Sequence, residues 1–137
     1  MRTLSFVVAA LAGLVLSVSL LAAGNEKPRA VGSMQDLMTG IIQPTSDAVF
    51  YISRTPPQSD ADWLDMERQT LMLAESANLL LIPGYREDGE RWLADVEKMR
   101  VAAEAALQAA RDRDMDTLID LNNDLYMSCE SCHEAIR

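Results

Sequence analysis

Six apolar residues recur along positions 92–110 at alternating spacings of four and three, the spacing that places side chains on one face of an α-helix. They are Trp92, Val96, Met99, Ala103, Ala106 and Ala110. The repeat spans seven residues and is rich in alanine, so it predicts a helix that approaches its neighbours closely. A half-buried strand would alternate apolar and polar residues every second position, and no such pattern stands out in the chain.

The composition also favours helices. Hydrophobic residues make up 49% of the 137-residue chain, but aromatic residues only 5%. A core with so few rings must be built from Ala, Leu, Ile, Val and Met, of which Ala, Leu and Met are good helix formers. The length predicts one domain.

Three further helical segments follow from capping and loop signals. Ser33 and Asp36 resemble a capping box that opens a helix reaching about Ile52, and Pro44 should bend or split this helix near Ile42. A second helix is expected from Ser59 or Asp60 to about Leu81, before the third helix described above. The fourth should run from about Met115 to the C-terminus. Its expected apolar face is Met115, Leu118, Ile119, Leu121, Leu125, Met127 and Ile136. Short connections predict an all-α, antiparallel, up-down-up-down four-helix bundle.

The first 24 residues have the features of a signal peptide. Arg2 precedes an uncharged run from Leu4 to Ala23, and Ala22 and Gly24 provide small residues at positions −3 and −1 of a cleavage site. The pattern predicts export to the periplasm, with residues 25–137 forming the folded domain. The alternative is an uncleaved anchor, because about twenty apolar residues can span a bilayer, and only then would the protein be attached to a membrane.

The formal net charge is −9. Nucleic-acid binding requires clustered Lys and Arg, so this charge argues against it. It is compatible with partners that present basic surfaces, and equally with charge that serves solubility alone.

Both cysteines and the only histidine lie in the last nine residues, in the sequence CESCHEAIR. On a helix, Cys129, Cys132 and His133 share one side. Cys-x-x-Cys-His is the attachment signature of covalent haem c, with two thioether links and histidine on the iron. Export supports this interpretation. The alternatives are a non-haem redox pair or a structural disulfide, although a redox pair usually opens a helix and this spacing suits a disulfide poorly. A zinc site would need a fourth ligand.

The position of this motif at the end of an all-helical exported chain resembles the cytochrome c′ and cytochrome c556 family, the class II c-type cytochromes. Their motif is Cys-x-x-Cys-His-x-x-(aromatic)-Arg, and Cys129, Cys132, His133 and Arg137 match it, whereas Ile136 replaces the ring. The resemblance implies a monohaem four-helix bundle with haem on the last helix. Arg137 is then a candidate partner for a haem propionate, or simply a basic residue near the helix carbonyls.

The resemblance also indicates the sixth iron ligand. The family often has Met or another large residue six positions before a proline, and Met38 and Pro44 have this spacing. Met38 is therefore the expected distal ligand, with Met34 as the fallback. Ligation by His and Met suits electron transfer between periplasmic redox proteins. An open site would instead bind NO or CO, as in the cytochromes c′. No histidine remains for acid–base catalysis, so we do not expect an enzyme. The resemblance also implies a possible homodimer, because family members often dimerise.

Overall fold

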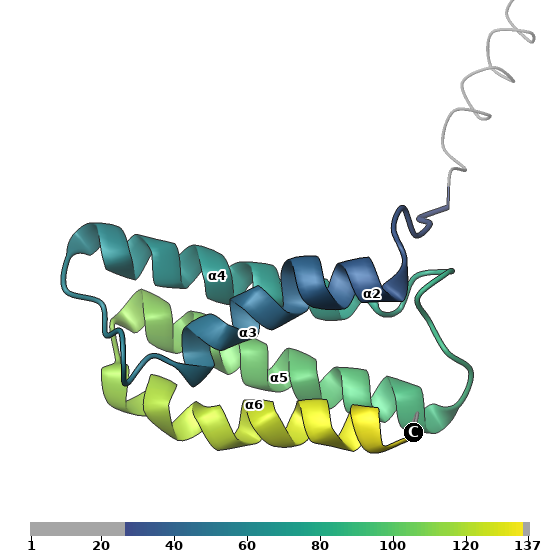
Figure 1. Ribbon diagram of the computed structural model, residues 1–137. Helices are drawn as coiled ribbons and strands as arrows, with labels where there is room; N and C mark the ends of the chain where they lie inside the picture. Colours follow the sequence, from purple (N-terminus) through teal and green to yellow (C-terminus); the bar gives the residue numbers. More distant parts are fainter. Residues whose placement is uncertain (1–26, 136–137) are drawn as a thin grey trace, which may run out of the picture.

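A computed structural model describes residues 27–135, which form four helical arms (Figure 1). The first arm consists of α2 (Met34–Leu37), the π-helix η1 (Met38–Ile42) and α3 (Gln43–Phe50), which follow one another without a break. The other arms are α4 (Asp60–Leu79), α5 (Glu90–Asp112) and α6 (Met115–Ala135). No strand occurs among these residues. The predicted all-α four-helix bundle is confirmed.

The first arm changes its helical pitch just before its proline. Ser33 and Asp36 form the predicted capping box: the Ser33 hydroxyl accepts from the Asp36 N–H at 3.1 Å, and the Ser33 N–H donates to the Asp36 carboxylate at 2.8 Å. Pro44 cannot donate a backbone hydrogen bond, and its ring would clash with the carbonyl four residues earlier. The wider π-turn ends at Ile42, where the sequence predicts a bend, and the Gln43 N–H reaches back to the Met38 carbonyl.

The later helices begin and end with their own caps. α4 opens with a second capping box, made by Ser59 and Asp62. α5 is capped by Arg113, whose φ of 56° and ψ of 35° are left-handed, a conformation usually reserved for glycine. The Asp114 carboxylate then accepts from the N–H of Thr117 at 3.0 Å and so caps α6. These two residues allow the tight turn between α5 and α6 without Gly or Pro.

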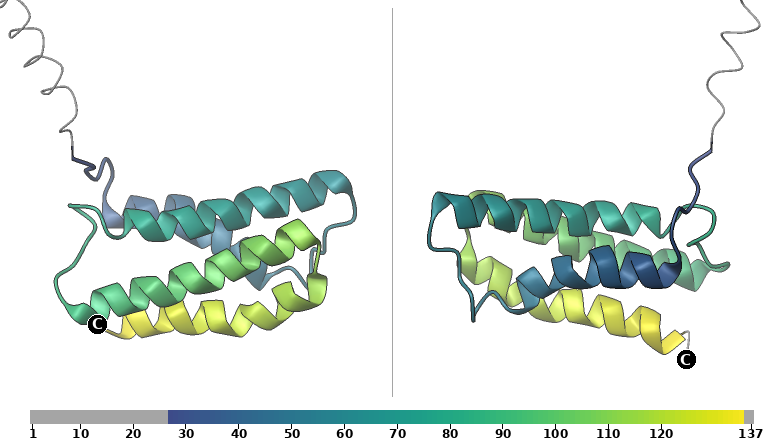
Figure 2. Two further views of the ribbon diagram at one scale, coloured as in Figure 1. Left: turned by 180° about the vertical axis from the view of Figure 1, so that it is seen from behind. Right: turned by 45° about the horizontal axis from the view of Figure 1, so that its top comes forward.

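The arms pack in a ring that matches the expected antiparallel order. α4 lies against α5, α5 against α6, and α3 against both α4 and α6 (Figure 2). All six residues of the seven-residue repeat in α5 are buried. The predicted face of α6 is partly wrong, because Ile119 and Met127 are 39% and 50% exposed. Among the described helices α6 packs mainly against α5 and α3, so its buried face is narrower than the sequence suggested.

The proposed leader, residues 1–24, lies outside the described residues. From residue 27 to residue 135, no helix combines the length and the apolar character needed to cross a bilayer.

Candidate functional site

Cys129, Cys132 and His133 line the same small cavity as Met38, although Met38 is about ninety residues earlier in the chain. All four arms contribute to this cavity. The remaining lining residues are Ile42 from the first arm, Leu80 from the end of α4, Val96 and Met99 from α5, and Ser128 from α6. Apart from the Ser128 hydroxyl, which donates to the Leu125 carbonyl at 2.7 Å, the lining is almost entirely apolar or sulfur-containing.

The two cysteines are half-buried and are not joined in a disulfide. Burial raises the pKa of the Cys129 thiol above its usual value, against weaker opposing hydrogen bonds. Burial also raises the pKa of the Cys132 thiol, and the nearby carboxylate of Asp95 adds to this effect. Thiolate is the nucleophilic form, so thiols with raised pKa values are poorly suited to disulfide exchange at neutral pH.

His133 lies in the last turn of α6, one residue after Cys132 and one helical turn after Cys129. Its side chain is exposed at the rim of the cavity. A ring that lies at a rim can reach a group that enters the cavity. The motif therefore presents two thiols and an imidazole towards one space.

Two methionines contribute to the cavity, and only one of them was expected to bind iron. Met38 is the first residue of η1 and is half-buried. Met34 is also half-buried, but it is not among the residues that line the cavity. Met99, which the sequence assigned only to the core seam, is buried and does line it. The thioethers of Met38 and Met99 are thus the two that share a space with the motif.

The cavity has a volume of about 50 Å³, much smaller than the roughly 300–1,000 Å³ of typical cofactor pockets. The arms that line the cavity are packed unevenly. α6 packs along α5 and against α3, whereas α2 and η1 make few close contacts with it. The first arm and the last turns of α6 draw apart towards the motif end of the bundle (Figure 2). Because about 50 Å³ is too small for a porphyrin, the side chains that line the cavity would have to move apart to admit one.

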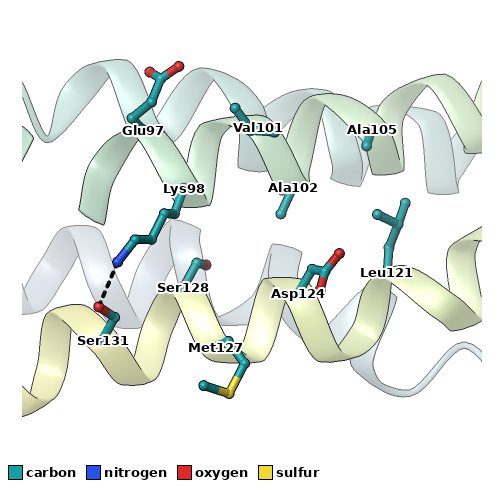
Figure 3. Close-up of a pocket in the computed structure, with 10 residues that line it drawn as sticks. All are labelled: Glu97, Lys98, Val101, Ala102, Ala105, Leu121, Asp124, Met127, Ser128 and Ser131. Carbon is teal, nitrogen blue, oxygen red and sulfur yellow. Dashed lines mark hydrogen bonds between the residues drawn. The ribbon is translucent and has the colours of Figure 1, made fainter. Parts of the chain in front are cut away.

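A larger groove of about 730 Å³ lies between α5 and α6 (Figure 3). Its floor includes Val101, Ala102 and Leu121, and Lys98 and Ser131 stand at one end. It contains neither cysteine nor the histidine. The smaller cavity is the better candidate for chemistry, because it alone combines thiols, an imidazole and thioethers.

The donor set of the small cavity suits haem. Two thiols on one helical face can form the two thioether links, an imidazole lies beside them, and a thioether faces them from the first arm. The almost wholly apolar lining also suits a porphyrin. Arg137 and Ile136 of the predicted motif lie outside the described residues. In residues 27–135, no three His, Cys, Asp or Glu side chains are grouped to hold a metal ion unaided.

A polar cluster behind the motif was not predicted from the sequence. Asp95 of α5 is only 3% exposed, although it is a carboxylate. The hydroxyl of Ser131 donates to Asp95 Oδ1 at 2.7 Å, and Lys98 Nζ donates to the same oxygen at 2.9 Å. Ser131 is the residue between Glu130 and Cys132, inside the motif itself. From the sequence alone, Asp95 would be expected to be exposed to solvent. Its contact with Ser131 arises only in the fold.

Searches of protein-family models, of curated proteins and of solved structures found no match to this chain.

Proposed function

We propose that the protein is an exported monohaem c-type cytochrome that carries single electrons. The observation that carries this proposal is the shared cavity of Cys129, Cys132, His133 and Met38. Three of these residues belong to an attachment signature, and the fourth approaches from a different arm of the bundle. The resemblance to the cytochrome c′ and cytochrome c556 family, noted from the motif and from the Met38–Pro44 spacing, leads to the same function.

Each residue then has a defined role. Cys129 and Cys132 would hold the porphyrin through thioether bonds, formed when each S–H adds across a vinyl group without a change of oxidation state. His133 would bind the iron from the α6 side, and Met38 from the first arm. Haem supplies a one-electron iron couple when bound. With both His133 and Met38 bound to the iron, a change of oxidation state would need little rearrangement of ligands, and the Met38 thioether would raise the reduction potential.

The surroundings of the motif support this assignment over a redox dithiol. The raised pKa values of both thiols disfavour the thiolate on which disulfide exchange depends. Haem attachment would instead use each thiol once and hold both sulfurs permanently in thioether bonds.

The proposed location is the periplasm, and the proposed partners are redox proteins of that compartment. Glu130 and Glu134 lie within and directly after the motif, and Glu134 is exposed. Carboxylates beside an electron-transfer site would attract a partner with a basic docking surface, and such attraction weakens as salt is added.

Optical spectra of the exported protein test the proposal. We expect a low-spin ferric spectrum with the methionine-to-iron charge-transfer band, and slow or absent CO binding by the ferrous form. Met38→Ala should remove this band and admit CO. Met34→Ala should preserve both features, because Met34 does not line the cavity. Met99→Leu tests whether the second thioether of the cavity binds the iron in place of Met38.

A high-spin wild-type spectrum with rapid CO or NO binding would instead favour the gas-binding alternative. Loss of the band in Met99→Leu but not in Met38→Ala would move the ligand to α5. Absence of haem would contradict both functions and favour the non-haem alternative.

A further inference from the structure

The middle of the haem-attachment motif is anchored to the neighbouring helix. The side chain of Ser131 leaves the face shared by the cysteines and contacts α5, where its hydroxyl donates to Asp95 Oδ1 at 2.7 Å. Arg91 Nη2 donates to the backbone carbonyl of Ser131 at 3.1 Å. The turn that carries Cys129 and Cys132 is thus fixed through both the side chain and the backbone of the residue between them.

Asp95 is the centre of this anchor. Lys98 Nζ donates to Asp95 Oδ1 at 2.9 Å and to the Ser131 hydroxyl at 3.0 Å, and Arg91 Nε lies 3.6 Å from Asp95 Oδ2. The side chains of Arg91 and Lys98 are 63% and 57% exposed, whereas that of Asp95 is 3% exposed. The carboxylate is therefore buried, and both cations reach it from the surface.

Asp95 remains charged despite its burial. Burial alone would raise its pKa, but the hydrogen bonds from Lys98 and Ser131 and the charges of Lys98 and Arg91 together outweigh it and lower the pKa. Little water screens the carboxylate itself, although the charges of Lys98 and Arg91 offset part of its field. Its Oδ1 accepts from the Ser131 hydroxyl at 2.7 Å, so the charge lies directly against the residue that precedes Cys132.

We propose that Asp95 is a positioning residue that holds the attachment turn through Ser131 and, as a fixed negative charge, lowers the reduction potential of the attached iron. This inference rests on the proposed function. A nearby anion stabilises ferric iron more than ferrous iron, because the ferric state carries one more positive charge. The hydroxyl of Ser131 partly neutralises the same carboxylate, so Asp95 and Ser131 have opposite effects on the potential.

Potentiometric titration of the haem-loaded protein tests these opposite signs. Asp95→Asn should raise the midpoint potential, because the charge is lost while most of the shape is kept. Ser131→Ala should lower the midpoint potential, because the carboxylate loses a hydrogen-bond donor. Ser131→Thr keeps a hydroxyl and should have the wild-type potential. Glu104→Gln is the matched control, since it removes a carboxylate from an exposed site on the same helix. It should shift the potential much less than Asp95→Asn.

Urea unfolding of the same variants tests the anchor itself. Asp95→Asn and Ser131→Ala should both unfold at lower urea than Glu104→Gln. Equal potentials in Asp95→Asn and Glu104→Gln, or shifts of the same sign in Asp95→Asn and Ser131→Ala, would overturn the inference while the cytochrome assignment stands. A wild-type protein without covalent haem would overturn both. If Asp95→Asn does not fold, the inference is tested by Ser131 alone. Ser131→Ala should then have a lower midpoint potential than the wild type, and Ser131→Thr the same potential as the wild type.

Discussion

Replacement of Trp92 by Phe should weaken the bundle next to the candidate site. Trp92 is 7% exposed, and its indole Nε1 donates to the Leu80 carbonyl at 3.0 Å. Leu80 follows the last residue of α4, where carbonyls have no partner within the helix, and no other donor among residues 27–135 is seen to reach this oxygen. Leu80 also lines the cavity that contains Met38 and the motif. Trp92 therefore fixes one wall of that cavity.

The expected cost has two parts. A buried carbonyl left without a donor costs about 1–3 kcal/mol, and the space vacated by the smaller ring adds roughly 1 kcal/mol. Trp92→Phe should thus lower the free energy of unfolding by about 2–4 kcal/mol, a large share of the 5–15 kcal/mol typical of a domain. Urea denaturation followed by far-UV circular dichroism measures this difference.

Trp63→Phe is the matched control for this change. Trp63 is half-buried, and its indole forms no hydrogen bond among the described residues, so the same substitution should cost about 1 kcal/mol or less. If Trp92→Phe costs no more than Trp63→Phe, the bond to Leu80 does not hold the end of α4, and the reasoning is refuted.

Two further predictions concern the helix ends. Arg113→Gly should be more stable than Arg113→Ala by about 1 kcal/mol in urea unfolding, because both lose the ion pair with Asp60 but only Gly adopts a φ of 56° without strain; equal stability would contradict this. The bundle should also weaken as the pH falls below about 4, and Asp62→Asn should lose less stability over that interval in urea unfolding. Hydrogen bonds from Gln58 and Ser59 lower the pKa of Asp62 below 3.8, so its contribution is present above that pH and is lost as the carboxylate protonates.

Much of the fold follows from local signals in the sequence. The two Ser–Asp capping boxes mark the starts of α2 and α4, and each is formed as a pair of reciprocal hydrogen bonds. Every residue of the seven-residue repeat is buried in α5, although the buried face also includes Asp95, Ala102, Leu107 and Ala109. Such features depend on residues that are three or four positions apart, so they can be recognised in the sequence without knowledge of the fold.

The features that the sequence did not predict depend on neighbours. Pro44 predicts a change in the helix, but whether that change is a kink or a π-turn depends on how the arm packs. Ile119 and Met127 fit the apolar period of α6, yet they are exposed because none of the described helices covers that side of α6. Asp95 is buried only because α6 brings Ser131 to it. The spacing of the motif indicates its chemistry, whereas its supporting contacts arise only in the folded chain.

The most direct test of the account is the intact mass of the exported, denatured protein. We predict that the wild-type chain carries the mass of one haem beyond that of the mature polypeptide, and that a chain with both Cys129→Ala and Cys132→Ala lacks this added mass. A wild-type protein that has the mass of the polypeptide alone, with the two cysteines free or joined in a disulfide, would contradict the central claim.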